Sequence, residues 1–483
     1  MNKLLKNIGG FSLGPIIGAV FSFITVPVTT HFISPEEYGK ASMFALAQSI
    51  LSTIIYLGMD QAFVREFNLM RDNKNKLLYN AIIIPMGLAL TVSVLVLIFH
   101  QYTSQILYDS DDEFLPVLSL ALLLPLMVLE TFALLNIRME EKGLLYSFFT
   151  IFLKAIVLMI TVLMLSLYEK SFRVVVYAAS LGEIITSIIL YILIIRKHNF
   201  SRELLDWDLQ KRMLKFGTPL VPAFAVGLIL TSMDKVMLRS ICTYSELGLY
   251  SAAFKIVSVL GVLQACFTLY WTPVAYRWYQ EGKSGEAFQN ISKIVAILLT
   301  VVAIGILLIK EIIAIILGNQ FRNAIDIFPF LLLYPVLYTL SETTGVGIGF
   351  KRKTAYSIVI TSIAGITNIA LNWLLIPMFN GTGAAMATGI SYIAFFWGRT
   401  LISRKLWYRF DLKVYIYSNI IIMSNCAIHT FMKGYFPYLF SVITLLAIII
   451  YFVQGVYFAY HQSNKFLFFL FFLRRLADMR SRG

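Results

Sequence analysis

Residues 77–100, LLYNAIIIPMGLALTVSVLVLIFH, form a continuous run without lysine, arginine, aspartate or glutamate. At about 1.5 Å per residue, a helix of this length crosses a hydrocarbon core of roughly 30 Å. Lipid offers no hydrogen-bond partner to the backbone, so such a run satisfies its own amides only as a helix. The stretch therefore predicts a transmembrane helix.

Thirteen further apolar runs of about 20 residues or more share this pattern. The whole chain of 483 residues is 59% apolar and only 14% charged, which excludes an ordinary soluble protein and a disordered one. We therefore expect an all-α polytopic membrane protein with fourteen transmembrane helices. The approximate boundaries are 8–33, 39–64, 77–100, 114–137, 144–168, 172–195, 213–239, 246–276, 288–309, 325–350, 354–377, 383–403, 412–432 and 437–460.

Cysteine and histidine spacing gives no sign of metal or disulfide chemistry. Cys242, Cys266 and Cys426 form no CxxC pair, and the five histidines form no ligand spacing. The net charge of +14 comes from basic residues that separate the apolar runs instead of forming one face. We expect no metal site, no catalytic residue set, no bound cofactor and no nucleic-acid partner.

Lysine and arginine fall mostly on one side when the predicted loops are assigned alternately to two faces. The side that holds the N-terminus collects 29 of these residues and the other side collects 7. Basic residues favour the cytoplasmic side, so both termini are expected there. The remaining four basic residues, Lys154, Lys235, Lys255 and Arg399, lie inside apolar runs.

The two halves of the chain repeat each other at a nearly constant offset. Glu37-Tyr38-Gly39 with Ser42 recurs as Glu246-Leu247-Gly248 with Ser251. Three further matches at a similar offset are Pro125 with Pro335, Ser147 with Ser357, and Arg196-Lys197 with Arg404-Lys405. Six helices per repeat is an even number, so the halves enter the membrane from the same side. This predicts two six-helix lobes related by an axis along the membrane normal, plus two extra C-terminal helices.

These patterns divide the chain into five parts. We expect residues 1–197 to form a first lobe, 198–212 a cytoplasmic linker with Trp207 at the membrane interface, and 213–405 a second lobe. Residues 406–460 would form the last two helices, and 461–483 a basic cytoplasmic tail. Phe466 to Leu473 is too short to span and predicts an interfacial anchor in that tail. Two lobes around a central site suit alternating access, in which the lobes rock and expose the site first to one face of the membrane and then to the other.

Five segments resemble a known family. They are Ser34-Pro35-Glu36-Glu37-Tyr38-Gly39, Leu57-Gly58-Met59-Asp60, Asp234-Lys235-Val236-Met237-Leu238, Glu246-Leu247-Gly248-Leu249-Tyr250-Ser251-Ala252-Ala253 and Gly381-Thr382-Gly383-Ala384-Ala385-Met386-Ala387-Thr388. Together they resemble bacterial polysaccharide biosynthesis membrane proteins, which belong to the multidrug/oligosaccharidyl-lipid/polysaccharide (MOP) exporter superfamily. The resemblance implies a MATE/MOP-like fold and flipping of undecaprenyl-pyrophosphate-linked oligosaccharide repeat units across a bacterial inner membrane. It also implies a role in O-antigen, capsule or exopolysaccharide synthesis beside membrane lipids, a polymerase and chain-length machinery.

Ionisable side chains within the bilayer cost about 2.5 to 3.5 kcal/mol on insertion scales, so they mark the candidate site. Lys255, Lys154 and Lys235 are candidate cations for a pyrophosphate group. The alternative for these lysines is a buried ion pair, with Asp234 or Glu130 as partners. In related flippases, cavity cations come largely from helices one, two, seven and eight, whereas helix one here offers only Thr25, Thr29, Thr30 and His31.

The intramembrane carboxylates are candidates for lining the cavity or for coupling transport to an ion. These residues are Asp60, Glu130, Glu183, Asp234 and Glu342. A proton, a sodium ion or the membrane potential alone could drive transport, and carboxylates that pair with lysines are the structural alternative. Arg399 is expected to reach the membrane interface. Tyr270 and Trp271 either stack on sugars or anchor the chain at the interface.

Two other functions remain open on sequence grounds. A multidrug or cation antiporter of the MATE type would favour a cavity dominated by carboxylates, against which the three lysines count. A membrane polymerase or ligase would ordinarily need a large outside loop for its catalytic residues, and no predicted outside loop exceeds about 20 residues. We therefore expect a transporter and no enzyme.

Overall fold

The structure is a computed structural model that describes residues 2–197 and 201–462. Within these ranges the chain is helical, without strands. The first half holds α1 (Asn2–Phe32), α2 (Pro35–Tyr56), α3 (Met59–Phe67), α4 (Lys74–Ile98), α5 (His100–Tyr108), α6 (Phe114–Met139), α7 (Gly143–Leu167) and α8 (Phe172–Leu193). The second half holds α9 (Trp207–Gly217), α10 (Val221–Ile241), α11 (Tyr244–Gln280), α12 (Gly285–Leu308), α13 (Lys310–Leu317), α14 (Ala324–Leu331), α15 (Leu333–Thr344), α16 (Val346–Phe350), α17 (Ala355–Leu406), α18 (Lys413–Phe431) and α19 (Phe436–Gln462).

The helices confirm an all-α polytopic membrane fold. Ten described helices are long and apolar enough to span a bilayer, and α2 with α3, bent by 53° at their junction, gives an eleventh. The 52-residue helix α17 contains a non-helical residue, Asn380, that separates two of the predicted spans. When α17 is counted as two spans and α18 and α19 are included, the spans correspond approximately to the fourteen predicted runs.

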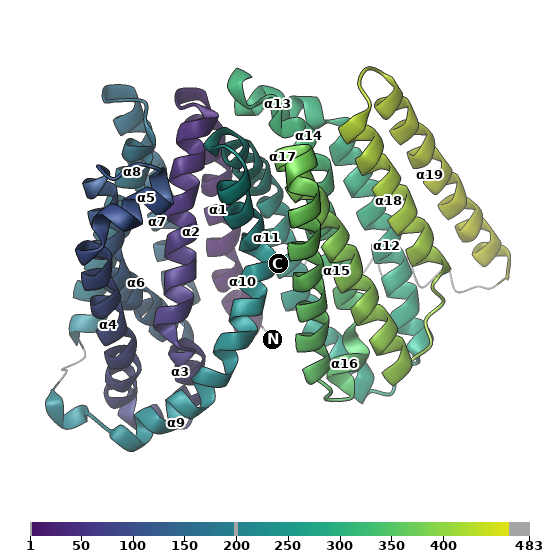
Figure 1. Cartoon of the computed structure of the whole chain (residues 1–483). Coiled ribbons are helices and arrows are strands. Elements are labelled where there is room, and N and C mark those ends of the chain that lie inside the picture. Colours follow the sequence, from purple (N-terminus) through teal and green to yellow (C-terminus); the bar gives the residue numbers. More distant parts are fainter. Residues whose placement is uncertain (1, 198–200, 463–483) are drawn as a thin grey trace.

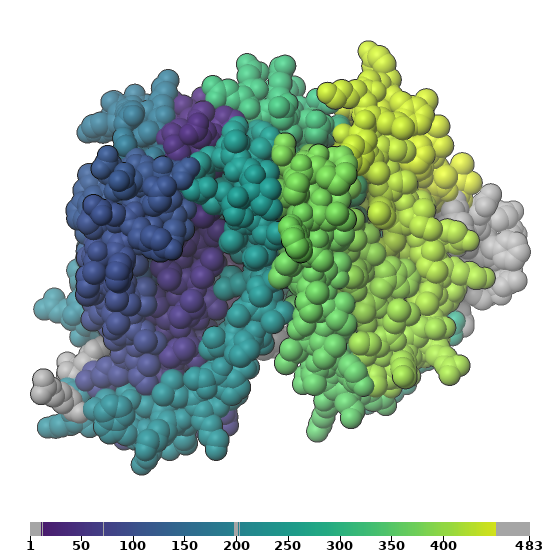
Figure 2. All heavy atoms as spheres, in the orientation of Figure 1, coloured from purple at the N-terminus to yellow at the C-terminus, as the bar shows by residue number. Residues whose placement is uncertain are grey.

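The helices form two groups side by side (Figure 1). Helices α1 to α8 lie in one group and α11 to α18 in the other, with α10 between them and α19 at the far edge. The space-filling view is hollowed between the groups toward the lower end (Figure 2). The loop at Asp109, which the charge distribution assigns to the outside, lies at the upper end, where α5 ends.

The sequence repeat corresponds to equivalent contacts in the two halves. The Glu37 carboxylate accepts a hydrogen bond of 2.6 Å from the backbone N–H of Phe172, where α8 begins. The Glu246 carboxylate accepts one of 3.1 Å from the N–H of Gly381, where the second part of α17 begins. Both pairs are 135 residues apart in the chain. In each half, therefore, the glutamate at the equivalent position accepts a hydrogen bond from an otherwise unpaired amide at a helix start.

The segment between the groups differs from the prediction. The helix expected from residue 213 begins at Val221, and α9 precedes it along the lower end of the first group (Figure 1). The Asp206 carboxylate accepts hydrogen bonds from the N–H groups of Asp208 and Leu209, and this N-cap starts α9 early. The predicted tail anchor, Phe466 to Leu473, lies outside the described residues.

Candidate functional site

A cavity of about 220 Å³ lies where the two groups of helices meet. Helices α1, α2, α7 and α8 form one wall, and α10 with α11 forms the other. Its lining residues are Ser22, Thr25, Val26, Thr29, Tyr38, Ala41, Ser42, Ala45, Lys154, Val157, Val175, Lys235, Ser251 and Lys255. A neighbouring cavity of about 310 Å³ shares Ser22, Lys154 and Lys255, and extends along α1 between α7 and α11.

The three predicted cations lie around this cavity. Lys154 extends from α7 in the first group, whereas Lys235 and Lys255 extend from α10 and α11 in the second. Lys255 is close enough to interact electrostatically with both other lysines. Among the described residues, no carboxylate lies within 4.0 Å of any of the three amines, so the ion pairs suggested with Asp234 or Glu130 do not form. The site therefore gathers positive charge from both groups of helices in one space.

Hydroxyl groups accompany these lysines. Thr25 and Thr29 on α1 line the cavity, as their place on helix one suggested, together with Ser22. The cavity is also lined by Ser42 and Ser251, the equivalent residues of the repeat. No pattern in the sequence predicted that these two serines, or Ser22, would line the site. In this state the hydroxyls of Thr25, Thr29 and Ser42 donate to backbone carbonyls of their own helices, and Ser251 donates to Ser42. Each can donate to an anionic oxygen once its hydroxyl rotates, and lysines supply the charge. Their combination suits an anionic group.

Asp234 does not line the cavity, although Lys235 beside it does. Its carboxylate is 1% exposed and accepts hydrogen bonds from Tyr250, Asn368 and Asn372 at 2.5, 2.9 and 2.5 Å, and also from Thr388. Consecutive residues of a helix diverge by about 100°, which explains why the two charges face different surroundings. Asp234 ties α10 and α11 to both parts of α17.

Glu130 on α6 and Glu183 on α8 lie beside Lys154 in the first group. Gln48 donates a hydrogen bond of 3.0 Å to Glu183, and Ser187 donates one of 3.2 Å to Glu130. Lys154 is near enough to interact electrostatically with both carboxylates without forming an ion pair. Asp60, on α3, instead accepts a hydrogen bond of 2.7 Å from Gln61 and is not a cavity residue.

Arg399 does not extend to the membrane interface as expected. Its guanidinium lies 2.5 Å from the Glu342 carboxylate, and the two side chains are only 19% and 12% exposed. It also donates a hydrogen bond of 3.0 Å to Ser341. A carboxylate on α15 faces this position of α17, so pairing satisfies the charge within the protein. Glu342 is therefore part of a structural ion pair away from the cavity.

Tyr270 and Trp271 also lie outside the cavity. Tyr270 is 67% exposed. Trp271 is 4% exposed, packs with Trp278 and Phe288, and donates a hydrogen bond of 3.2 Å to the backbone carbonyl of Glu342. Neither is placed to stack on a sugar in the cavity of this state.

The upper end of the cavity is closed by contacts between the two groups of helices. The Ser42 and Ser251 hydroxyls lie 3.1 Å apart, and the Tyr244 hydroxyl donates a hydrogen bond of 2.9 Å to the carbonyl of Leu107. Arg239 and Asp109 form an ion pair at 3.3 Å. A Cβ atom on Gly39 would overlap the carbonyl of Tyr244, so the close approach of α2 and α11 requires glycine there.

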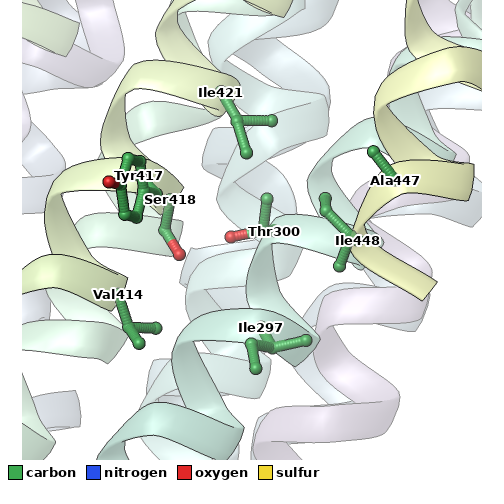
Figure 3. Close-up of a pocket in the computed structure, with 8 residues that line it drawn as sticks. All are labelled: Ile297, Thr300, Val414, Tyr417, Ser418, Ile421, Ala447 and Ile448. Carbon is green, nitrogen blue, oxygen red and sulfur yellow. The ribbon is translucent and has the colours of Figure 1, made fainter. Parts of the chain in front are cut away.

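A separate groove of about 290 Å³ lies between α12, α18 and α19 (Figure 3). Its lining is mainly apolar: Ile297, Thr300, Val414, Tyr417, Ser418, Ile421, Ala447 and Ile448. It has no charged lining residue, and lies apart from the lysines. A surface of this kind accepts apolar chains and no ionic group.

Comparison with known proteins agrees with this architecture. The model of the family described as polysaccharide biosynthesis protein matches residues 4–279. The structure is similar to the lipid II flippase MurJ in an inward closed conformation, with a TM-score of 0.72 and 15% identity over 94% of this chain and 99% of that one.

Two MATE structures share the fold. An inward-facing multidrug resistance MATE family transporter of the MOP superfamily matches with a TM-score of 0.59 and 16% identity over 81% of this chain and 94% of that one. MATE in the bent conformation matches with a TM-score of 0.55 and 15% identity over 87% and 97%. No curated protein sequence matches the chain. The chain therefore belongs to the polysaccharide biosynthesis protein family, and has the fold of the MurJ and MATE transporters.

Proposed function

We propose that this protein is a flippase that moves undecaprenyl-pyrophosphate-linked oligosaccharide repeat units from the cytoplasmic to the outer face of a bacterial inner membrane. Both termini would lie in the cytoplasm, and the product would supply a polymerase and its chain-length machinery for O-antigen, capsule or exopolysaccharide. The family and the transporter fold support the general activity, a MOP-type flippase. The finer proposal depends on the chemistry of the cavity.

The observation that carries the proposal is the convergence of three lysines on one cavity from both groups of helices. Lys154, Lys235 and Lys255 have no carboxylate partner within ion-pair distance among the described residues. A pyrophosphate group carries several negative charges and would be held by such a cluster with the neighbouring hydroxyls. A site built for cationic drugs would present the opposite charge to its ligand.

The arrangement of the cavity supports alternating access. Contacts at the upper end, including the Ser42 to Ser251 hydrogen bond, close the cavity toward the face that we assign to the outside. The molecule is hollowed toward the other end (Figure 2). This arrangement would admit substrate from the cytoplasm, and separation of α2 from α11 would release it outward.

The membrane potential supplies a sufficient drive in this proposal. Moving two negative charges outward across about 100 mV, inside negative, gains roughly 4 to 5 kcal/mol. Coupling to a proton or to sodium would add to this gain in free energy. A potassium ionophore with equal potassium on both sides removes the potential, an electroneutral potassium/proton exchanger with equal potassium removes the pH gradient, and omission of sodium removes the sodium gradient. These three conditions distinguish the drives, because each removes one of them and leaves the others.

The test is translocation of a fluorescent undecaprenyl-pyrophosphate oligosaccharide in proteoliposomes. Label that becomes accessible to an external sugar-modifying enzyme is scored under an imposed potential. Lys255→Gln and Lys154→Gln should each slow translocation about tenfold or more, since a charge-assisted hydrogen bond is worth about 1.5 to 3 kcal/mol. Lys353→Gln, an exposed lysine outside the cavity, is the matched control.

The outcomes separate the competing functions. Movement above that of empty liposomes that is lost in both cavity variants supports the flippase. No movement of several repeat units by folded protein overturns the proposal, and export of cationic dyes by the same protein would favour a multidrug transporter. Lengthening of the oligosaccharide would favour a polymerase.

A further inference from the structure

We propose that Glu130 and Glu183 share a single proton, and that this proton controls how strongly Lys154 binds an anionic head group. The inference rests on the proposed function and deepens it, because it assigns a proton-binding site next to the cavity. It is carried by the arrangement of three charged side chains on α6, α7 and α8.

The two carboxylates are held on facing surfaces of α6 and α8. Glu183 and Ser187 are one turn apart on α8 and share a face of that helix. The Ser187 hydroxyl donates a hydrogen bond of 3.2 Å to Glu130 Oε2. This bond places the Glu130 carboxylate beside Ser187, one helical turn from Glu183, which is near enough for the two charges to influence each other.

Lys154 is brought to the same place by close packing of α7 on α8. A Cβ atom on Gly182, the residue before Glu183, would lie 3.3 Å from the Cα atom of Val157. Val157 lies one turn after Lys154 on the same face of α7, and both residues line the cavity. The lysine therefore lies between the carboxylate pair on one side and the cavity on the other.

Few hydrogen bonds are available to hold two full negative charges at this place. Among the described contacts, Glu130 accepts from Ser187, and Glu183 accepts from Gln48 at 3.0 Å. Neither carboxylate forms an ion pair within 4.0 Å among the described residues. Two like charges in a medium of low dielectric favour retention of one proton between them.

The remaining titratable groups near the pair are few. Tyr56, at the end of α2, lies near enough to interact electrostatically with both carboxylates and with Asp60 on α3. Tyr56 shares a hydrogen bond of 2.8 Å with Thr131 and does not bond to either carboxylate. Across the cavity, Lys255 on α11 interacts with Lys154. The carboxylate pair is therefore the acidic group whose charge acts on Lys154, beyond ion-pair distance, and Lys255 reinforces the attraction for an anion.

One proton changes what an arriving anion encounters. With both carboxylates ionised, two negative charges outweigh the single positive charge of Lys154 and repel a phosphate group. When one carboxylate takes up a hydronium proton from the bulk solution through the cavity and forms an O–H bond, a single negative charge remains, which Lys154 balances while it keeps its own proton. The anion then binds more tightly. By thermodynamic reciprocity, binding of the anion promotes uptake of that proton.

The experiment uses the full-length protein in nanodiscs with inorganic pyrophosphate as the probe. Calorimetry in two buffers of different ionisation enthalpy, at about pH 6 and about pH 8, gives both affinity and the number of protons taken up. Pyrophosphate itself also titrates between these pH values, and this contribution is the same for every variant. We therefore divide the dissociation constant of each variant by that of the wild type at the same pH, which cancels the contribution of pyrophosphate.

We expect the wild type to lose affinity with rising pH more steeply than Glu130→Gln or Glu183→Gln, by up to about tenfold per pH unit for one linked proton. Both glutamine variants should also take up fewer protons on binding. Glu183→Asp, which keeps an ionisable group, should restore the linkage. Glu169→Gln, an exposed carboxylate with the same change of charge, should behave as the wild type.

The results distinguish this inference from the proposed function. One outcome is that folded wild-type protein binds pyrophosphate and Lys255→Gln weakens that binding, but Glu130→Gln and Glu183→Gln keep the full pH dependence. In that case proton sharing is overturned and the flippase proposal survives. If the wild type does not bind pyrophosphate at either pH, both proposals fall together. Thermal unfolding of each variant confirms that it is folded before binding is interpreted.

Discussion

Ser42 and Ser251 occupy equivalent positions in the two halves of the chain, 209 residues apart, and their hydroxyl oxygens lie 3.1 Å from each other. The contact joins α2 to α11 at the closed end of the cavity. Equivalent residues of a repeat meet one another only near the axis that relates the two copies. This pair therefore locates that axis at the closure between the lobes.

A disulfide at this position should stop transport. We expect Ser42→Cys with Ser251→Cys to form a disulfide on mild oxidation, because the side-chain oxygens are already near contact. Cross-linked protein should lose translocation, and a reducing agent should restore it.

Two controls accompany the disulfide experiment. Ser42→Cys with Ser258→Cys moves the second thiol two turns along α11, about 10 Å away, and should stay active. Wild-type protein under the same oxidation controls for the native cysteines. Full transport by fully cross-linked protein would show that α2 and α11 do not separate at this point.

A methyl group at the glycine contact should favour the state that is open at the upper end. A Cβ atom on Gly39 or Gly248 would overlap a backbone carbonyl of the other lobe. This overlap raises the free energy of the closed state alone, because the two lobes are in contact there only in that state. Overpacking typically costs about 1 to 3 kcal/mol, which corresponds to a population shift of about fivefold to 150-fold.

Labelling of Ser42→Cys by a membrane-impermeant maleimide from outside measures this shift. It should accelerate in the presence of Gly248→Ala. Gly87→Ala, whose new methyl group would meet no atom within 4 Å, is the control and should leave the labelling rate unchanged. Equal rates in the two variants would contradict the assignment of this contact as the closure.

The Glu342 to Arg399 ion pair should contribute to the stability of the second lobe. Glu342→Gln leaves a mostly buried guanidinium without its partner, and we expect a loss of about 2 to 4 kcal/mol in the free energy of unfolding. Replacing both residues should recover part of that loss, which a double-mutant cycle measures.

The exposed pair of Glu140 and Lys142 is a matched comparison. Their charged atoms lie 2.7 Å apart, but the lysine side chain is 57% exposed. Glu140→Gln should therefore cost less than about 1 kcal/mol. Similar losses at the two sites, measured by denaturant unfolding in detergent, would rule out a special role for burial at Arg399.

The start of α9 should weaken in acid. The pKa of Asp206 lies below its ordinary value because Lys76 donates to the carboxylate at 2.8 Å and the N–H of Leu209 also donates to it. A lowered folded-state pKa stabilises the protein above the unfolded value of about 4, and this contribution disappears as pH falls through the lower folded value. Asp206→Asn keeps the cap but cannot titrate, so its melting temperature should fall less between about pH 5 and about pH 3. Parallel curves for the two proteins would exclude this contribution.

The framework of the protein was largely predictable from sequence, because apolar length and repeated motifs report it directly. Glu37, Gly39 and Ser42 marked the repeat. In the structure Glu37 caps a helix within the first half, whereas Gly39 and Ser42 form the close approach and the hydrogen bond that join the two halves. The position of each charged residue along its apolar run also identified the three lysines that line the cavity. Their role toward a substrate stays a prediction.

The partners of the charged residues were not predictable in the same way. Counting along a helix gives the depth of a side chain but not the helix that faces it. Arg399 was therefore assigned to the interface, although Glu342 lies 57 residues earlier and faces it. Asn368 and Asn372 look like ordinary polar residues of a span, yet they donate to Asp234 on α10. Pairing across helices depends on helix rotation, which periodicity in a uniformly apolar segment does not fix.

The repeat of the framework contrasts with the charges of the cavity, which occur once. At the offset of 209 residues, Lys235 and Lys255 correspond to Val26 and Leu46, which are apolar. The lobes therefore meet as two copies of one subunit would in a symmetric dimer, while each lobe brings a different set of ionisable groups to the shared space. One lobe carries acids beside its lysine and the other brings lysines alone, so that a repeated framework encloses an asymmetric chemistry.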